Sequence, residues 1–452
     1  MNNSVPMIVA NFRVVSVSVI HGTRRIDVSM DDYPRILFHR QILENLLKYG
    51  SDIALIVVIC SSKMDFGISA TCVIPRDLPP WCEDLRNVFN DFIIEMDDPL
   101  LLPFSSGTGG KQRCVILTHK NYSSATAILK RALFDELVVN TRRRTVAVLP
   151  FYHASGFWAL LYCLLEGCHT IIMKSFHPIS MLEIIEKYEI DTLNVVPSIL
   201  SFLCRMDIYR FNVSSLSTVL CGSSPLGKEL INLFLRKFPN VQNLVQGYGM
   251  TEVVVLSHIT PLGIVDEKRF GTCGKLLPGF EAILRDDNGR LINEPYCAGE
   301  LYIKSPTVMR GYLNLETDEE PFDQDGWFKT GDVLYYDDEG FFFVVDRVKD
   351  LIKVNGVQVA PSEIEDIILT LPFVKEVGVI GVNDPEHGQV PKAFIVLEEE
   401  EDEEYAKKNI LALVKAKLSP IKQLRGGIEV RMELPKTNSG KVKRYALRNL
   451  YE

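Results

Sequence analysis

The sequence lacks several of the patterns that assign a protein to a specialised class. Its ten cysteines include no Cys-x-x-Cys pair and no cysteine–histidine cluster at zinc-binding spacing. We therefore expect reduced thiols in a reducing compartment. No apolar run is long enough to span a bilayer, and the most apolar window, 156–165, is predicted to be a buried helix. The formal net charge of −9 argues against nucleic acid or an anionic membrane as the main partner.

Targeting signals are also missing from the sequence. Residues 1–15 have no basic segment followed by a sustained apolar core, which a secretory signal requires. The last residues, NLYE, match neither a peroxisomal nor an endoplasmic-reticulum retention signal. We therefore expect a cytoplasmic protein.

Between residues 104 and 300, short apolar segments alternate with amphipathic ones. Strands are predicted at 145–151, 169–175, 191–197 and 216–222, and helices at 178–189 and 226–238. This alternation is typical of an α/β fold with a doubly wound parallel sheet. Ligands of such a sheet bind at the carboxyl ends of its strands.

The pattern changes from residue 299 onward. A β-rich stretch comes first, and the C-terminal part then combines strands and helices as a compact α+β unit does. We place the boundary near Asp346, which gives an N-terminal domain of residues 1–346 and a C-terminal domain of residues 347–452. The acidic run 398–404 is predicted to be a solvated loop.

The stretch SSGTGGKQR, residues 105–113, concentrates glycine with serine and threonine. Such a loop can turn backbone N–H groups and hydroxyls toward phosphate oxygens, although a flexible surface turn has the same composition. It does not match the P-loop pattern GxxxxGK[ST], because Gln112 follows Lys111.

Three further motifs carry groups that suit a nucleotide. In QGYGMTE, two glycines flank Tyr248, so that its ring can lie against a purine, and Glu252 offers an oxygen ligand to magnesium. A tight packing turn would look the same. Asp332 and Arg347 are expected on neighbouring strands, where they would bind a ribose diol or form a surface salt bridge. Lys441, on the loop PKTNSGK, provides a cation that can enter a cleft.

The order of these motifs resembles that of the adenylate-forming enzymes, which include acyl-CoA synthetases, 4-coumarate–CoA ligases, beetle luciferases and peptide-synthetase adenylation domains. The resemblance covers roughly residues 95–452. It rests on the Ser/Gly/Thr loop and then on PFYHASGF, GSSPLG, QGYGMTE, GELYIKSPTVMRGYLN, GWFKTGD, DRVKDLIKVNGVQVAPSEIE and PKTNSGK. The segment DRVKDLIKVNGVQVAPSEIE is most similar to the coumarate-ligase and luciferase branch.

This resemblance implies a site for ATP, with Mg²⁺ held by Glu252. The phosphate loop would wrap the β- and γ-phosphates, Tyr248 and the turn after 221 would enclose adenine, and Asp332 and Arg347 would bind the ribose. The implied nucleotide-binding residues are Ser105, Ser106, Gly107, Thr108, Gly110, Arg113, Gly222, Ser223, Ser224, Gly247, Tyr248, Gly249, Asp332, Arg347 and Gly356. The implied catalytic residues are Lys441, Lys353, Glu252, Thr251 and His153.

The resemblance also implies a reaction in two halves. A carboxylate first attacks the α-phosphorus of ATP, with Thr251 at the α-phosphate and Lys441 bridging the two anions. The thiol of coenzyme A then attacks the acyl-adenylate. A small, mobile C-terminal domain would turn about Asp346 between the halves, bringing Lys353 and Gly356 to the site in place of Lys441. His153 corresponds to a histidine of the acyl pocket, or is a structural histidine.

The sequence departs from the family pattern at two places. The family usually has Thr-Gly-x-Pro-Lys-Gly in the phosphate loop. This sequence lacks the proline and the last glycine of that motif, and Arg113 replaces its lysine. Only residues 57–104 lie between the segment that resembles the family's first strand and this loop. The family usually carries more residues there, so part of the first sheet is expected to be missing. A splice product, an incomplete gene model and a degenerate paralogue would each explain this shortening.

We therefore expect an ATP-dependent acid–CoA ligase acting on a fatty or aryl-propenoic acid. One alternative is a catalytically impaired homologue that binds nucleotide or a partner protein, and a weaker one is a luciferase-like oxygenase. The pocket candidates His153, Ser223, Gly247 and Val254 do not identify the acid, and the oligomeric state does not follow from the sequence.

Overall fold

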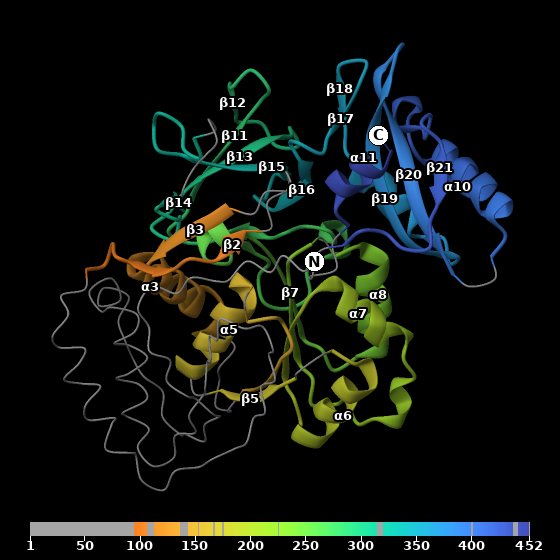
Figure 1. Ribbon diagram of the computed structural model, residues 1–452. Coiled ribbons are helices and arrows are strands. Elements are labelled where there is room, and N and C mark those ends of the chain that lie inside the picture. Colours follow the sequence, from red (N-terminus) through yellow and green to blue (C-terminus); the bar gives the residue numbers. More distant parts are fainter. Residues whose placement is uncertain are drawn as a thin grey trace, which may run out of the picture.

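Figure 1 shows the computed structural model of the chain. It describes residues 95–105, 113–135, 143–151, 153–165, 168–173, 176–224, 226–313, 320–398, 401–436 and 442–451. Most of the stretch that we expected to be shortened, 57–94, lies outside these residues.

A seven-stranded sheet forms the centre of the larger part of the molecule, in the order β10-β9-β8-β7-β6-β4-β5. Five of its strands are parallel, and β9 and β10 continue it in antiparallel pairing. The strands are β4 (Arg144–Ala147), β5 (His169–Ile172), β6 (Thr192–Val195), β7 (Thr218–Cys221), β8 (Asn243–Tyr248), β9 (His258–Ile259) and β10 (Lys275–Leu276). The predicted parallel sheet is confirmed, although β4 to β7 are each shorter than the apolar segments suggested.

Helices cover both faces of this sheet, as the alternation of its side chains requires. On β8, Leu244 packs into the cluster formed with α6, α7 and α8, and the next residue, Val245, packs into the cluster formed with α3 and α5. The helices are α3 (His119–Leu129), α5 (Ala154–Leu165), α6 (Pro178–Tyr188), α7 (Pro197–Arg205) and α8 (Lys228–Lys237). The apolar window 156–165 lies within α5, which confirms the predicted buried helix.

Two smaller sheets continue this part of the molecule. A four-stranded sheet contains β1 (Pro99–Leu101), β2 (Phe104–Ser105), β3 (Arg113–Thr118) and β14 (Gly311–Leu313). A five-stranded antiparallel sheet contains β12 (Leu291–Ile292), β11 (Glu281–Arg285), β13 (Gly299–Lys304), β15 (Phe328–Tyr336) and β16 (Phe342–Arg347). The expected β-rich stretch is therefore present.

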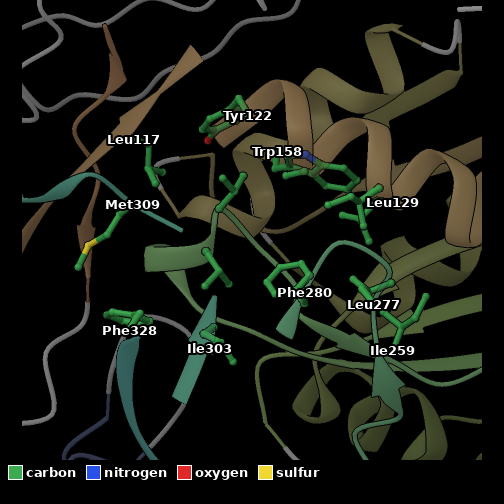
Figure 2. Close-up of a cluster of buried hydrophobic side chains, with 14 of the residues drawn as sticks. Leu117, Tyr122, Leu129, Trp158, Ile259, Leu277, Phe280, Ile303, Met309 and Phe328 are labelled. Atoms are coloured by element: carbon green, nitrogen blue, oxygen red, sulfur yellow. The ribbon is translucent and has the colours of Figure 1, made fainter. Parts of the chain in front are cut away.

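One apolar cluster ties these sheets to α3 and α5 (Figure 2). Leu117 on β3, Tyr122 on α3, Trp158 on α5 and Ile303 on β13 all belong to it and are at most 5% exposed. Burying a side chain of this size contributes about 1.5–3 kcal/mol. The cluster therefore fixes the β-rich sheets against the helices beside the parallel sheet.

The C-terminal part is an α+β unit. Its sheet contains β18 (Val357–Val359), β17 (Ile352–Val354), β20 (Gly388–Leu397), β19 (Val374–Asp384) and β21 (Ile428–Val430). Its helices are α9 (Pro361–Ile368), α10 (Glu403–Lys417) and α11 (Arg444–Tyr451). Buried residues of α9 and α10 pack with Val377 and Val379, whereas Leu447 of α11 packs with Ile380 and Val382. The helices therefore lie on opposite faces of this sheet.

Short helical turns connect the longer elements. They are η3 (Lys130–Phe134), η4 (Ile208–Arg210), η5 (Thr251–Val253), η6 (Glu267–Arg269) and η7 (Pro420–Lys422).

The solvated loop predicted at 398–404 is only partly confirmed. Glu403 and Glu404 are not in a loop but begin α10, and Asp402 caps that helix by accepting a hydrogen bond from the Tyr405 amide. The positive end of the helix dipole favours acidic residues in the first turn, so their charge promotes the helix there. In the part of the chain that the structure describes, no helix is both long and apolar enough to cross a membrane.

Candidate active site

A hydrogen-bonded group is formed by Tyr248 at the end of β8, Asp332 within β15 and Arg347 at the end of β16. Asp332 on β15 lies directly opposite Arg347 on β16. The Tyr248 hydroxyl donates to Oδ2 of Asp332 at 2.5 Å, and Nε of Arg347 lies 2.5 Å from Oδ1. The sequence prediction that Asp332 and Arg347 occupy neighbouring strands is confirmed. We call these three residues the ribose group, after the role that the sequence resemblance implies for Asp332 and Arg347.

The carboxylate of the ribose group is buried. Only 5% of the Asp332 side chain is exposed, so the surface-salt-bridge alternative is wrong for this carboxylate. Burial raises the pKa of Tyr248, and the negative charge of Asp332 raises it further. Burial alone would lower the pKa of Arg347, but nearby acidic groups, Asp332 first among them, outweigh it and raise this pKa. Tyr248 is therefore neutral and Arg347 charged at neutral pH.

The backbone beside Tyr248 is tightly packed. A Cβ on Gly249 would lie 2.0 Å from the carbonyl oxygen of Val255, so only glycine fits there. Behind the tyrosine, His258 is fully buried, with its ring centroid 5.6 Å from that of Tyr248 and 4.5 Å from that of Phe342. Burial lowers the pKa of His258 to about 3, so the imidazole is neutral. These contacts fix the tyrosine ring.

The turn Gly222–Ser224 lies beside Tyr248 at the carboxyl end of the parallel sheet. It follows β7, whose last residue, Cys221, pairs with Gln246 of β8. Gly222 and Gly247 are consequently neighbours, and a Cβ on Gly222 would lie 3.6 Å from the Gly247 carbonyl oxygen. Ser223 has a φ of 78°, a conformation that few non-glycine residues adopt. The structure thus brings the two predicted adenine-binding segments together.

The two ends of the predicted phosphate loop are also adjacent. Ser105 on β2 pairs with Arg113 on β3, so residues 106–112 connect two antiparallel strands. Four of the predicted loop residues lie outside the described residues, namely Ser106, Gly107, Thr108 and Gly110.

Glu252 contacts β14, the neighbour of β3, through Tyr312, a residue that the sequence analysis missed. It lies on η5, whose first residue is Thr251, and it is 8% exposed. The hydroxyl of Tyr312 on β14 donates to Oε1 of Glu252 at 3.0 Å, and the Arg113 guanidinium lies 5.2 Å from the centre of the Tyr312 ring. Tyr312 stands in the quoted motif VMRGYLN, but it can be matched to Glu252 only once β14 is known to pair with β3.

The remaining predicted residues lie in several places. His153 precedes α5, and its Nδ1 is 2.9 Å from the Ser155 hydroxyl. Lys353 is exposed on β17, and Gly356, with a φ of 79°, lies in the turn to β18. Among the described contacts, no side-chain hydrogen bond or ion pair joins Lys353 to the ribose group or to Glu252. Lys441 lies outside the described residues.

Comparison with known proteins agrees with this geometry. The family model for AMP-binding enzymes matches residues 40–313, and the model for their C-terminal domain matches residues 363–441. The chain belongs to the adenylate-forming AMP-binding enzymes. The resemblance is therefore confirmed, and so is the α/β fold that the alternation of strands and helices predicted.

Relatives at similar identity have different reactions in their names. A probable 4-coumarate–CoA ligase of Dictyostelium discoideum is 35% identical over 78% of this chain and 63% of its own length. The peroxisomal OPC-8:0-CoA ligase of Arabidopsis thaliana is 36% identical over 78% of this chain and 64% of its own length. A luciferin 4-monooxygenase of Nipponoluciola cruciata is 32% identical over 87% and 71%. The chain thus spans less than two thirds of the length of the two ligases.

Solved structures of the family have the same fold. The o-succinylbenzoate–CoA synthetase of Bacillus subtilis in complex with ATP and magnesium is 30% identical, with a TM-score of 0.68 over 78% of this chain and 71% of that one. ATP-bound MatB from Rhodopseudomonas palustris is 26% identical, with a TM-score of 0.71 over 79% of this chain and 69% of that one.

The donor groups of the site suit a magnesium ion that is bound mainly through substrate. The described residues contain no group of three or more His, Cys, Asp or Glu side chains that would hold a metal by themselves. Glu252 nevertheless presents a buried carboxylate of which Tyr312 occupies one oxygen. Mg²⁺ is typically bound by one or two carboxylates, several waters and substrate phosphates. Glu252 beside the phosphate loop fits that pattern.

Proposed function

We propose that the chain activates a carboxylic acid with ATP and transfers the acyl group to coenzyme A. In the first half, a carboxylate oxygen attacks the α-phosphorus, the bond to pyrophosphate breaks, and an acyl-adenylate forms. In the second half, the thiolate of coenzyme A attacks the activated carbonyl and AMP leaves. The observation that carries the proposal is the ribose group beside the Gly222–Ser224 turn and Glu252.

Each residue of the site has a proposed task in this scheme. The Asp332 carboxylate accepts hydrogen bonds from the ribose hydroxyls, and Arg347 forms an ion pair with it. Tyr248 and the turn at Gly222 enclose the adenine. Glu252 would hold magnesium, which neutralises phosphate charge when bound. Thr251 and Lys441 would contact the α-phosphate, where Lys441 offsets the repulsion between two anions that must approach each other.

The substrate and the later steps form the finer part of the proposal. A fatty or aryl-propenoic acid is supported by relatives named as coumarate and OPC-8:0 ligases. Lys353 and Gly356 would serve the thioester-forming half after a rotation about Asp346, with residues 1–346 and 347–452 as the two domains. We further propose a cytoplasmic location.

The test is acyl-CoA formation by purified protein with ATP, Mg²⁺, coenzyme A and a panel of fatty and aryl-propenoic acids, followed by mass spectrometry. Asp332→Asn removes the charge that accepts hydrogen bonds from the ribose. Since a hydrogen bond to a charged group contributes about 1.5–3 kcal/mol, we expect the KM for ATP to rise roughly 10- to 100-fold. Asp338→Asn, at an exposed position on the same hairpin, is the matched control and should leave the KM unchanged.

A nucleotide-binding protein without catalysis is the second candidate, favoured by the altered sequence of the phosphate loop. It predicts ATP binding that depends on Asp332 but no acyl-CoA or AMP with any acid. Product formation from one acid of the panel would exclude it.

A further inference from the structure

Consecutive side chains at the end of β16 connect to different parts of the molecule. Arg347 contacts Asp332 in the ribose group. Asp346, one residue earlier, instead accepts a hydrogen bond from Nη1 of Arg444 at 2.8 Å, and Arg444 begins α11 of the C-terminal unit. Neighbouring residues of a strand point to opposite faces, so one short stretch of backbone carries both contacts.

Arg444 is the centre of a cluster of charged side chains, called the Arg444 cluster, made of Arg444, Asp346, Asp350, Glu365 and Arg448. Nε and Nη2 of Arg444 contact the two oxygens of Glu365 at 3.0 and 2.6 Å, which is a bidentate pair. Nη1 also lies 3.5 Å from Asp350, and Arg448 donates to Asp350 at 2.9 Å.

The Arg444 cluster is largely shielded from water. The side chains of Arg444 and Asp346 are 16% and 4% exposed. Burial alone would lower the pKa of Arg444, but the carboxylates of Glu365, Asp346 and Asp350 outweigh it and raise this pKa. Arg444 is therefore a fixed positive charge among three carboxylates, which would repel one another without it.

The backbone around Asp346 is held by the same unit. The amide of Ser362 donates to Oδ2 of Asp346 at 3.0 Å, and the hydroxyl of Ser362 donates to the carbonyl oxygen of Val345 at 2.7 Å. The amide of Arg347 donates to Oδ1 of Asp346 at 2.8 Å. The residues from which Arg347 extends are thus fixed by contacts to α9 and α11.

We propose that Arg444 is a positioning residue for the nucleotide site: it fixes Asp346 and thereby aims Arg347 at Asp332, so that nucleotide binding is coupled to the docking of α11. This inference rests on the proposed nucleotide site. Coupling between two sites is reciprocal. Arg444 should strengthen nucleotide binding, and bound nucleotide should in turn protect α11.

The experiment compares Arg444→Lys with Arg448→Lys. Lysine keeps the positive charge but cannot make the bidentate contact to Glu365 and contact Asp346 at the same time. Arg448 lies on the same helix, but its hydrogen bonds go to Asp350 and the Lys349 carbonyl, so it is the matched control. The Kd for AMP is measured by calorimetry. We expect about a 10-fold increase for Arg444→Lys, within the usual range of coupling, and no change for Arg448→Lys.

Hydrogen exchange of residues 442–451 is the second readout. AMP should slow exchange there in the wild type and in Arg448→Lys, but not in Arg444→Lys. A purely structural role would lower the melting temperature and leave both the Kd of the folded protein and the AMP-induced protection intact. If Arg444→Lys does not fold, Asp346→Asn keeps the shape of the partner, removes its charge and is expected to give the same two effects.

Binding of AMP to the wild-type protein separates a failure of the Arg444 proposal from a failure of the proposed function. Wild-type protein that does not bind AMP would contradict the nucleotide site and the coupling together. Wild-type protein that binds AMP, with an unchanged Kd and unchanged protection in the folded variants, would overturn the role of Arg444 alone.

Discussion

Burial of the neutral imidazole of His258 predicts a specific loss of stability in mild acid. Burial lowers the pKa of His258 from 6.5 to about 3 in the folded protein. The unfolded chain therefore takes up a proton as the pH falls below 6.5, while the folded protein does not. The contribution of His258 to the free energy of unfolding is fully present above pH 6.5 and is lost as the pH falls toward 3. Between pH 7.5 and 5.0 the loss is about 2 kcal/mol.

The substitution His258→Phe removes this titration and keeps an aromatic ring beside Phe342. The free energy of unfolding is measured by urea denaturation of the wild type and the variant at pH 7.5 and 5.0. The variant will be less stable at pH 7.5, because it loses the contact of Nδ1 with the Ser257 hydroxyl. The decisive quantity is the pH effect, which should be about 2 kcal/mol smaller in the variant. An equal pH effect in both proteins would refute the assignment of a buried, neutral His258.

Three further substitutions have outcomes that follow from the packing. Gly249→Ala places a Cβ 2.0 Å from a backbone oxygen and should abolish AMP binding and lower the melting temperature, whereas Gly227→Ala, with nothing within 4 Å, should leave AMP binding unchanged. Tyr312→Phe removes the hydrogen bond to Glu252 and should cost about 1–3 kcal/mol in urea denaturation; an unchanged stability would contradict the observed contact. Asp402→Ala removes the cap of α10 and should cost about 1 kcal/mol in the same assay, and no loss would show that the cap is dispensable.

The central sheet was predictable because its strands are short apolar runs between amphipathic helices. Their ends were less predictable: the apolar run at 191–197 includes Pro197, which begins α7 instead of ending β6. Proline favours the first turn of a helix, where its missing N–H is not needed. The start of α10 was missed for a related reason, since a run of acidic residues suggested solvent exposure and concealed a helix cap at Asp402.

The site was predictable where the motif itself carries the chemistry. Asp332 and Arg347 are close in sequence and on adjacent strands, so their pairing could be anticipated. Tyr312 and Glu252 are 60 residues apart, and Arg444 and Asp346 are 98 residues apart. Contacts of this kind depend on strand pairing and helix docking across the fold, which no local pattern encodes. The roles assigned to individual residues stay predictions.

Acid-dependent exchange of labelled pyrophosphate into ATP tests the proposed activity most directly, because it reports the adenylating half-reaction alone. The protein should be confirmed beforehand to unfold cooperatively. We expect exchange with at least one fatty or aryl-propenoic acid, its loss in Lys441→Ala, and its retention in Lys415→Ala, an exposed position on α10. Folded protein that binds ATP but gives no exchange with any acid would contradict the account.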